Sequence, residues 1–196
     1  MASFRNEKYF LSNMYPCSVT INVNGELYTM KSSETVFQAL RSPQNLKDFL
    51  HLDGFAAKRL SKTLKARDDW FDVNVDVMRY ALRCKFTQNP DLAAKLIAIE
   101  CEIVEENEWH DTFWGVCNGT GKNWLGRLLM ELRDELQNKD KNNTQSEAFM
   151  TSPIGDLPVN SYGLRMAVDE IARCHAEIKS LKEHNAELLS ELSLPF

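Results

Sequence analysis

The stretch VTINVNGELYTMKSSETVFQALRSP, residues 19–43, decides how the first part of the chain is expected to fold. Apolar residues alternate through VTINV, an Asn-Gly pair follows, and ELYT continues the alternation, which is typical of a β-hairpin with a type I′ turn. The segment SSETVFQALRS then predicts a helix, because Ser32 or Ser33 can cap its start and Pro43 comes just after its end. We therefore expect a small antiparallel hairpin directly before a helix.

Helical patterns continue beyond this stretch. Residues 55–66 read as a helix, and DVMRYALRCKF, residues 76–86, places apolar side chains on one side. In NPDLAAKLIAI, Asn89 is a candidate cap and Pro90 takes the first helical position, which is a clear start signal. The following EIVEEN, residues 102–107, can extend that helix or form a short strand, and periodicity does not decide between them.

The segment DTFWGVCNGTGKNW, residues 111–124, comes before another helix, whose leucines recur on one face as far as about Gln137. Its three glycines let the backbone approach a ligand closely, and a helix start behind such a loop suits an anion. Asn123 is a candidate N-cap of that helix. The loop matches neither a Walker P-loop nor a GxGxxG motif, so no nucleotide-triphosphate or dinucleotide motif is inferred.

The composition is that of a soluble globular protein, with 43% apolar and 26% charged residues in a chain of 196. The N-terminus lacks an apolar signal core, and no apolar run is long enough to cross a bilayer. The five cysteines are widely spaced and form no ligand set with the four histidines. We therefore expect a cytoplasmic protein with no membrane association and no structural metal. A net charge of −5 argues against general nucleic-acid binding.

The end of the chain is organised differently. Residues 138–162 are polar, contain Pro and Gly, show no periodicity and read as a linker after a domain of residues 1–137. Residues 163–194 place apolar side chains in two rows with a heptad repeat, and Asn185 occupies one a position, which favours paired parallel helices. This pattern predicts a homo-oligomer, specifically a dimer, formed through a C-terminal coiled coil. An amphipathic helix docked on its own domain is the alternative.

Two clusters of polar residues are candidates for a site. Glu34 and Gln38 share one helix face, and the helix dipole favours an ionised carboxylate in a first turn. Glu34 alone is better explained as an ordinary first-turn acid, because glutamate is common in a first helical turn. Lys58 and Lys62 also share a face, with Arg59 beside them, and together they can hold a diphosphate by charge-assisted hydrogen bonds. The basic segment that contains them is also compatible with a solvated helix face.

A set of sequence blocks occurs in a characteristic order. The blocks are YFLSNMYP (9–16), SSETVFQA (32–39), AAKRLSK (56–62), RDDW (67–70), KFTQNP (85–90), DTFWG (111–115) and NWLGRLLMELR (123–133). In order and approximate spacing they resemble the NADAR family, also called the YbiA-like family, over nearly all of residues 4–136. The resemblance implies an α+β fold, a compact and mostly helical domain with a small antiparallel sheet.

The resemblance also implies an activity. Proteins of this family are N-glycosidases that cleave bonds between a ribose-like carbon and a nitrogen, and no metal or organic cofactor is expected. Some members hydrolyse phosphorylated intermediates of riboflavin biosynthesis, and others remove ADP-ribose from guanine bases in nucleic acid. The leading hypothesis for this chain is removal of ADP-ribose from guanine. The riboflavin-pathway reaction on a phosphoribosyl compound and a noncatalytic ADP-ribose- or nucleotide-binding module are the alternatives.

The family motifs imply roles for individual residues. Glu34 is the expected catalytic carboxylate, Asp111 a second acid, and Lys58 a group that grips phosphate or assists at the ribose. A carboxylate beside the sugar carbon can stabilise positive charge and activate water, while a second acid supports the departing base. This sequence has Thr35 where the family usually has His. The expected substrate-binding residues are Ser12, Asn13, Gln38, Arg59, Trp70, Trp114, Gly115 and Asn123.

Overall fold

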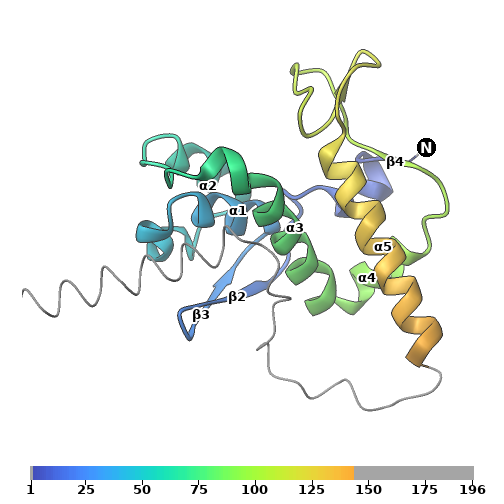
Figure 1. The fold of residues 1–196 in the computed structure, drawn as a ribbon, viewed down its shortest axis with the longest axis horizontal. Coiled ribbons are helices and arrows are strands. Elements are labelled where there is room, and N and C mark those ends of the chain that lie inside the picture. Colours follow the sequence, from blue (N-terminus) through green and yellow to red (C-terminus); the bar gives the residue numbers. More distant parts are fainter. Residues whose placement is uncertain (1, 144–196) are drawn as a thin grey trace, which may run out of the picture. The chain divides into compact units, whose positions relative to one another are not determined.

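The computed structural model describes residues 2–143, which form helices and short strands around a hydrophobic core (Figure 1). The expected coiled coil at residues 163–194 and all but the start of the expected linker at 138–162 lie outside the described residues. Within residues 2–143, no helix combines the length and the apolar character needed to cross a membrane. In chain order the elements are β1 (Ala2–Ser3), the 3₁₀ helix η1 (Asn6–Leu11), β2 (Val19–Val23), β3 (Glu26–Met30), α1 (Ser33–Arg41), the 3₁₀ helix η2 (Pro43–Phe49), α2 (Gly54–Ser61), α3 (Trp70–Gln88), α4 (Pro90–Ile97), β4 (Ile103–Val104), β5 (Glu106–Asn107), β6 (Val116–Cys117) and α5 (Trp124–Asn143).

The hairpin and the helix after it form as the sequence predicts. β2 and β3 pair antiparallel, and the two residues between them, Asn24 and Gly25, have φ values of 55° and 85°. Positive φ at both positions is what a type I′ turn requires, and Asn and Gly adopt it with the least strain. Ser32 then caps α1, because its hydroxyl accepts a hydrogen bond from the Thr35 N–H at 3.1 Å. The sequence prediction of a mostly helical fold with a small antiparallel sheet is confirmed.

Helix α3 lies at the centre of the core. It packs against α1, α4, α5 and β2, and its buried side includes Val77, Met78 and Leu82. Figure 1 shows α3 and α5 side by side, with the hairpin and α1 on the other side of α3. Burial of apolar side chains along α3 therefore holds together segments that are far apart in the sequence.

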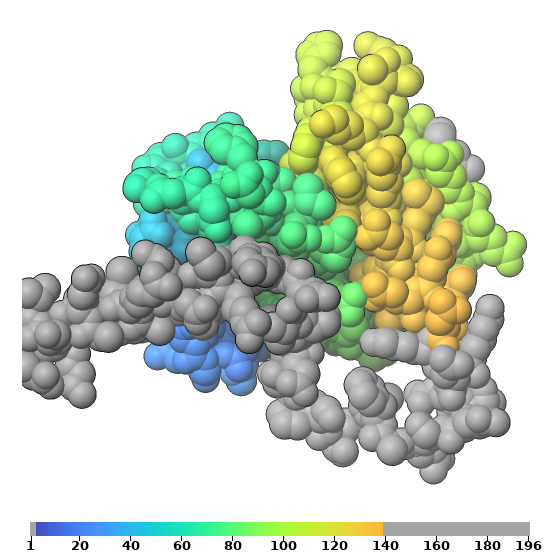
Figure 2. Space-filling model, viewed as in Figure 1, coloured from blue at the N-terminus to red at the C-terminus, as the bar shows by residue number. Residues whose placement is uncertain are grey.

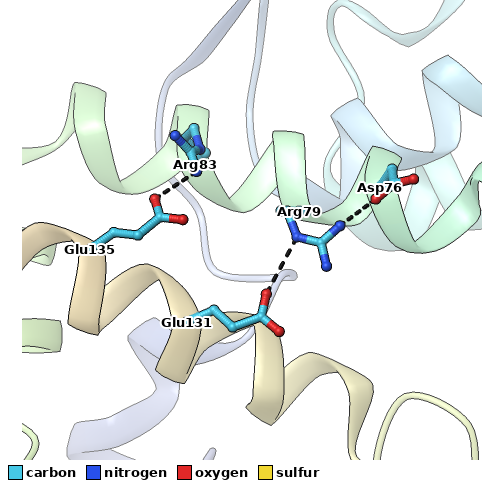
Figure 3. A network of polar contacts seen from close by, with 5 residues as sticks. All are labelled: Asp76, Arg79, Arg83, Glu131 and Glu135. Carbon is cyan, nitrogen blue, oxygen red and sulfur yellow. Dashed lines mark hydrogen bonds and ion pairs between the residues drawn. The ribbon is translucent and has the colours of Figure 1, made fainter. Parts of the chain in front are cut away.

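Ion pairs join α3 and α5 at the exposed edge of their contact (Figure 3). Arg79 of α3 lies between Asp76 and Glu131, and Arg83 pairs with Glu135 of α5 at 2.6 Å. All five side chains are partly exposed, and exposed pairs of this kind contribute at most about 1 kcal/mol each. These pairs therefore add little to the stability of the contact between the two helices.

The segment EIVEEN, residues 102–107, forms strands, and α4 ends before it at Ile97. β4 pairs parallel with β1, and β5 pairs parallel with β6, so residues 2–143 contain three two-stranded sheets. Of these, only the β2–β3 hairpin is antiparallel. The two parallel pairings go beyond the single antiparallel sheet that the sequence predicts, because they join segments that no local pattern connects.

Three helix boundaries differ from the prediction. α2 ends at Ser61, earlier than predicted, because the backbone after it turns back onto α1. The Arg41 guanidinium donates to the Ser61 carbonyl, and the Arg67 N–H donates to the Arg41 carbonyl at 2.9 Å. α3 begins at Trp70 and α5 continues to Asn143, both beyond the predicted limits. The end of α5, residues 138–143, is polar and shows no apolar repeat, so periodicity alone misses it. The start of α3 is largely apolar and includes the buried Trp70 and Val73, so the helix begins more than one turn before the segment that the sequence predicts.

Candidate active site

A hollow of about 650 Å³ collects most of the residues that the sequence marks as functional. Its walls come from the chain start through η1 and the loop after it, from α1 and α2, and from the segment between β4 and α5, with one residue each from α3 and α5. Within residues 2–143, no group of three or more His, Cys, Asp or Glu side chains is arranged to hold a metal ion. The predicted site residues that line this hollow are Ser12, Asn13, Glu34, Gln38, Lys58, Asp111 and Trp114.

Glu34 lies in the first turn of α1, with only 2% of its surface exposed. Each carboxylate oxygen accepts a hydrogen bond from an amide: Gln38 donates to Oε1 at 2.8 Å, and Asn13 donates to Oε2. Burial raises the pKa of Glu34, while the Gln38 bond, the nearby Lys58 ammonium and the Asn13 bond oppose that effect. The largest influence on the pKa of Glu34 is therefore burial, and not the helix dipole that the sequence suggests.

A buried lysine holds the loop that carries Ser12 and Asn13. The Lys85 ammonium of α3 donates to the carbonyls of Phe10 and Ser12, both at 2.7 Å, and burial lowers the pKa of Lys85 to about 7. The Asn13 carbonyl in turn accepts the Glu34 N–H at 2.9 Å. These bonds place the Asn13 amide against the Glu34 carboxylate. Lys85 belongs to the block KFTQNP, residues 85–90, but nothing in its local sequence pattern indicates this role.

Asp111 faces the same hollow as Glu34, and its carboxylate also organises the loop. Its Oδ1 accepts the backbone N–H groups of Phe113 at 3.0 Å and Trp114 at 2.8 Å. The Asn107 amide donates to the Asp111 carbonyl at 2.7 Å and accepts the Asp111 N–H at 3.0 Å. Side-chain turns of this kind fix the backbone locally. Asp111 therefore orients Trp114, and its role as a second acid stays a prediction.

Glu105, a further acid in the hollow, is missed by the sequence analysis. It lies between β4 and β5, and its Oε2 is buried without a hydrogen-bond partner among the described residues. Burial and then the charge of Asp111 raise the pKa of Glu105 to about 7, against the opposing effect of Lys58. A carboxyl group with this pKa is partly protonated at neutral pH and can donate a proton. No motif in the sequence marks Glu105. Its segment, residues 102–107, differs from its neighbours only in that periodicity does not decide between helix and strand.

Trp114 stands between this hollow and a smaller one of about 390 Å³, since it lines both. Trp70, a predicted substrate-binding residue, lines only the smaller hollow. The Phe37 ring joins the two tryptophans, with its centre 4.8 Å from Trp70 and 5.5 Å from Trp114. Figure 2 shows a notch between the green segment of α2 and α3 and the yellow segment before α5, the segments that line the smaller hollow.

Three predicted substrate-binding residues lie outside both hollows. Arg59 is exposed on α2. Gly115 packs against Glu105, because a Cβ there would lie 1.9 Å from the Glu105 Oε2, so the glycine permits loop packing. Asn123 has a φ of 51°, and its amide donates to the Ile103 carbonyl at 2.9 Å and accepts the Glu105 N–H at 3.1 Å. The Asn123 side chain therefore ties the loop to β4 and makes no N-cap bond to α5.

The start of α5 does not offer the anion site that the sequence suggests. The N–H groups of Trp124 and Leu125 donate to the carbonyls of Phe113 and Trp114, at 3.3 Å and 2.9 Å. The loop before the helix thus occupies two of the donors that an anion would use. Positive charge in the two hollows comes from side chains instead, and Lys58 is the one that lines both.

Comparison with known proteins identifies related sequences. The NADAR domain model matches residues 2–137. A riboflavin biosynthesis protein of Vibrio vulnificus is 41% identical over 134 residues, which are 65% of this chain and 35% of that protein. The riboflavin biosynthesis protein PYRR of Zea mays is 34% identical over 143 residues, 64% of this chain and 23% of that protein. N-glycosidase YbiA of Escherichia coli is 46% identical over 71 residues, 36% of this chain and 44% of that protein.

By sequence, the chain spans less than half the length of each of these three relatives. The similarity is broader in three dimensions. The NMR structure of the Escherichia coli protein YbiA matches with a TM-score of 0.62 and 30% sequence identity, and the match covers 77% of this chain and 89% of that chain. The matched family model includes every residue that lines the two hollows.

Proposed function

The chain belongs to the NADAR family, and from this membership and the geometry of the larger hollow we propose that it hydrolyses the N-glycosidic bond of ribosyl compounds. The substrate we propose is ADP-ribose attached to a guanine base in nucleic acid, so that the reaction reverses ADP-ribosylation. One matching relative carries the name N-glycosidase YbiA, which supports the general class of reaction.

The observation that carries this proposal is the buried Glu34 carboxylate. Two amides hold its oxygens, and it lines a hollow that also contains Lys58 and Trp114. Cleavage of a C1′–N bond builds positive charge on the sugar ring. A carboxylate that is already fixed and poorly hydrated stabilises such charge without reorganising, which is the main requirement for electrostatic catalysis.

The proposed hydrolysis uses two acids in different states. The C1′–N bond breaks, its electron pair stays on the nitrogen, and water forms the new C1′–O bond. Glu34 stabilises the sugar and takes the proton that water loses, and Glu105 gives a proton to the departing nitrogen. We prefer Glu105 to Asp111 as the donor because two backbone N–H groups already occupy the Asp111 Oδ1. The raised pKa of Glu105, about 7, supports the same choice.

The remaining residues of the hollow suit binding. Lys58 can pair with a phosphate oxygen, and the Trp114 ring offers a face for a base. Asn13 and Ser12 supply polar groups for ribose hydroxyls, next to the carboxylate that acts on C1′. In this arrangement the departing base, the ribose and the phosphate next to it each meet a complementary group in the larger hollow.

Hydrolysis of phosphorylated intermediates of riboflavin biosynthesis is the second candidate. The observation that favours it is the match to the riboflavin biosynthesis proteins of Vibrio vulnificus and Zea mays. Such a substrate also carries a phosphoribosyl group on a nitrogen, so the same carboxylate and lysine would serve.

Mass spectrometry of separate incubations distinguishes the candidates. The purified chain is mixed with an oligonucleotide that carries ADP-ribosyl-guanine and, in another tube, with a phosphoribosyl-aminopyrimidine. We expect free ADP-ribose in the first and slower or no cleavage in the second. Glu34→Gln should reduce the rate by about 10²–10³-fold, the usual effect of removing one preorganised charged group. Glu106→Gln is the matched control, because Glu106 is an exposed acid of the same hollow.

Each other outcome has a distinct meaning. Cleavage of the aminopyrimidine alone would favour the riboflavin-pathway reaction. Binding of ADP-ribose without turnover of either substrate would identify a noncatalytic module. A Glu34→Gln protein that is folded and fully active would exclude Glu34 as the catalytic carboxylate.

A further inference from the structure

The smaller hollow differs from the larger one in charge. α1, α2, the start of α3 and the loop before α5 bound it. Its charged side chains are Arg41, Lys58 and Lys62, all basic, whereas four acids and two basic residues, Arg5 and Lys58, line the larger hollow. Both volumes lie in the range of about 300–1,000 Å³ that is typical of ligand sites. The larger hollow thus suits a group that becomes positive, and the smaller hollow suits an anion.

Aromatic side chains supply the rest of the smaller hollow. Trp70, Phe113 and Trp114 form part of its wall, and Phe71 lies at its rim with 90% of its surface exposed. A single exposed phenylalanine is common on a protein surface, but exposed apolar side chains that gather around a cavity mark a contact site. Among the described residues, the exposed large apolar side chains are Tyr9, Leu27, Phe55, Phe71 and Trp109, and all except Leu27 line one of the two hollows.

The smaller hollow also contains an acceptor without a donor. The Asn74 Oδ1 is buried and has no hydrogen-bond partner among the described residues, although the Asn74 amide donates to the Phe71 carbonyl at 3.1 Å. Leaving a buried acceptor unpaired is unfavourable. A ligand that brings an N–H or O–H donor to this point would satisfy it.

The two hollows are adjacent. Lys58, Gln38 and Trp114 line both, and the Gln38 amide also holds the Glu34 carboxylate. Lys58 lies on α2 one helical turn before Lys62, which lines only the smaller hollow. A ligand that extends from Glu34 past Lys58 therefore enters the basic, aromatic hollow.

We infer that the smaller hollow is a subsite for a nucleoside monophosphate unit attached to the ribose whose N-glycosidic bond is cleaved. Its phosphate meets Lys58 and Lys62, its base stacks on Phe71, and the exocyclic amino group of the base donates to the Asn74 Oδ1. This inference rests on the proposed function and deepens it. The chain then selects substrates with two phosphate-linked nucleoside halves over substrates with one phosphoribosyl group.

Calorimetric titration of the full chain with adenosine 5′-monophosphate tests the subsite without catalysis. Phe71→Ala and Lys62→Gln should each weaken binding on the order of tenfold, the usual effect of losing one base-stacking ring or one phosphate contact. Leu27→Ala and Lys65→Gln are the matched controls, because both residues are exposed and line neither hollow. Equal affinity for the wild type and both subsite variants would overturn the inference.

Kinetics then test the link to the reaction. Phe71→Ala and Lys62→Gln should raise KM for ADP-ribosyl-guanine about tenfold and leave KM for a phosphoribosyl-aminopyrimidine unchanged. Equal effects on both substrates would refute selection by the subsite. If the wild type turns over neither substrate, the proposed function fails, and the titration alone decides the subsite. Comparing ADP-ribosyl-guanosine with the oligonucleotide shows whether the bound unit is the adenylate half or a neighbouring nucleotide.

Discussion

Replacing Glu105 with glutamine should stabilise the fold at neutral and alkaline pH. In the folded chain, burial and the charge of Asp111 raise the pKa of Glu105 from its ordinary value of 4.5 to about 7. The folded state thus binds this proton more tightly than the unfolded state does. The contribution of Glu105 to stability is fully present below about pH 4.5, falls as the pH rises to about 7, and stays low above it. Glutamine does not ionise, so the variant avoids that loss.

The size of the gain follows from the displaced pKa. A difference of one in pKa is worth about 1.4 kcal/mol, so a rise from 4.5 to about 7 sets an upper limit of about 3.4 kcal/mol. Glu105 is only partly buried, and solvent screening reduces the effect. We therefore expect Glu105→Gln to raise the free energy of unfolding by about 1–2 kcal/mol at pH 8 and by much less near pH 4.5.

Urea unfolding followed by tryptophan fluorescence measures this difference. The wild type and Glu105→Gln are compared at both pH values, so that other titrating groups, including Lys85, cancel in the comparison. Glu106→Gln is the control and should change stability by less than about 0.5 kcal/mol, because Glu106 is exposed. A variant that is no more stable than the wild type at pH 8, or that gains equally at both pH values, would refute the reasoning.

Three other perturbations test the supports of the site. Lys85→Met should lower the free energy of unfolding by about 2–4 kcal/mol, because the carbonyls of Phe10 and Ser12 lose a buried donor; urea unfolding within 0.5 kcal/mol of the wild type would contradict this. Gly115→Ala should destabilise by more than about 2 kcal/mol, since its Cβ would lie 2.3 Å from the Glu105 backbone carbonyl oxygen, which cannot move aside as a side chain can; Gly119→Ala, with open space but a φ of 76°, should lose only about 1 kcal/mol in the same assay. Light scattering should find a dimer for the full chain and a monomer for a chain that ends at residue 143, and two monomers would end the coiled-coil proposal.

The elements that the sequence predicts well depend on local physical chemistry. Asn24-Gly25 sets its own turn, Ser32 caps the helix that begins beside it, and Pro90 starts α4. In each case the deciding contact or conformation involves neighbours in the chain. Asn123 shows the limit of such reasoning. It precedes α5 as a cap would, but its side-chain amide forms hydrogen bonds with the Ile103 carbonyl of β4 and with the Glu105 N–H.

Glu105 shows the same limit for the site. Its pKa depends on Asp111, Lys58 and Glu34, and its burial depends on Gly115, which packs against its carboxylate. None of these contacts has a fixed sequence spacing, so no motif in a single sequence indicates them. Glu34 could be identified only because its family block is distinctive, since an acid in a first helical turn is common.

The larger hollow gives the order of the family blocks a physical explanation. The blocks at 9–16, 32–39, 56–62 and 111–115 all contribute side chains to its wall. The block at 123–133 adds Leu125 to the same wall, and its Asn123 side chain accepts the Glu105 N–H. The block at 85–90 acts through the first block, because Lys85 holds the loop that carries Ser12 and Asn13. Blocks that lie far apart in the sequence therefore meet around one hollow, where their side chains can contact the same ligand. The same reasoning extends to Trp70 of the 67–70 block, which lines the smaller hollow and is therefore expected to contact the far half of the substrate.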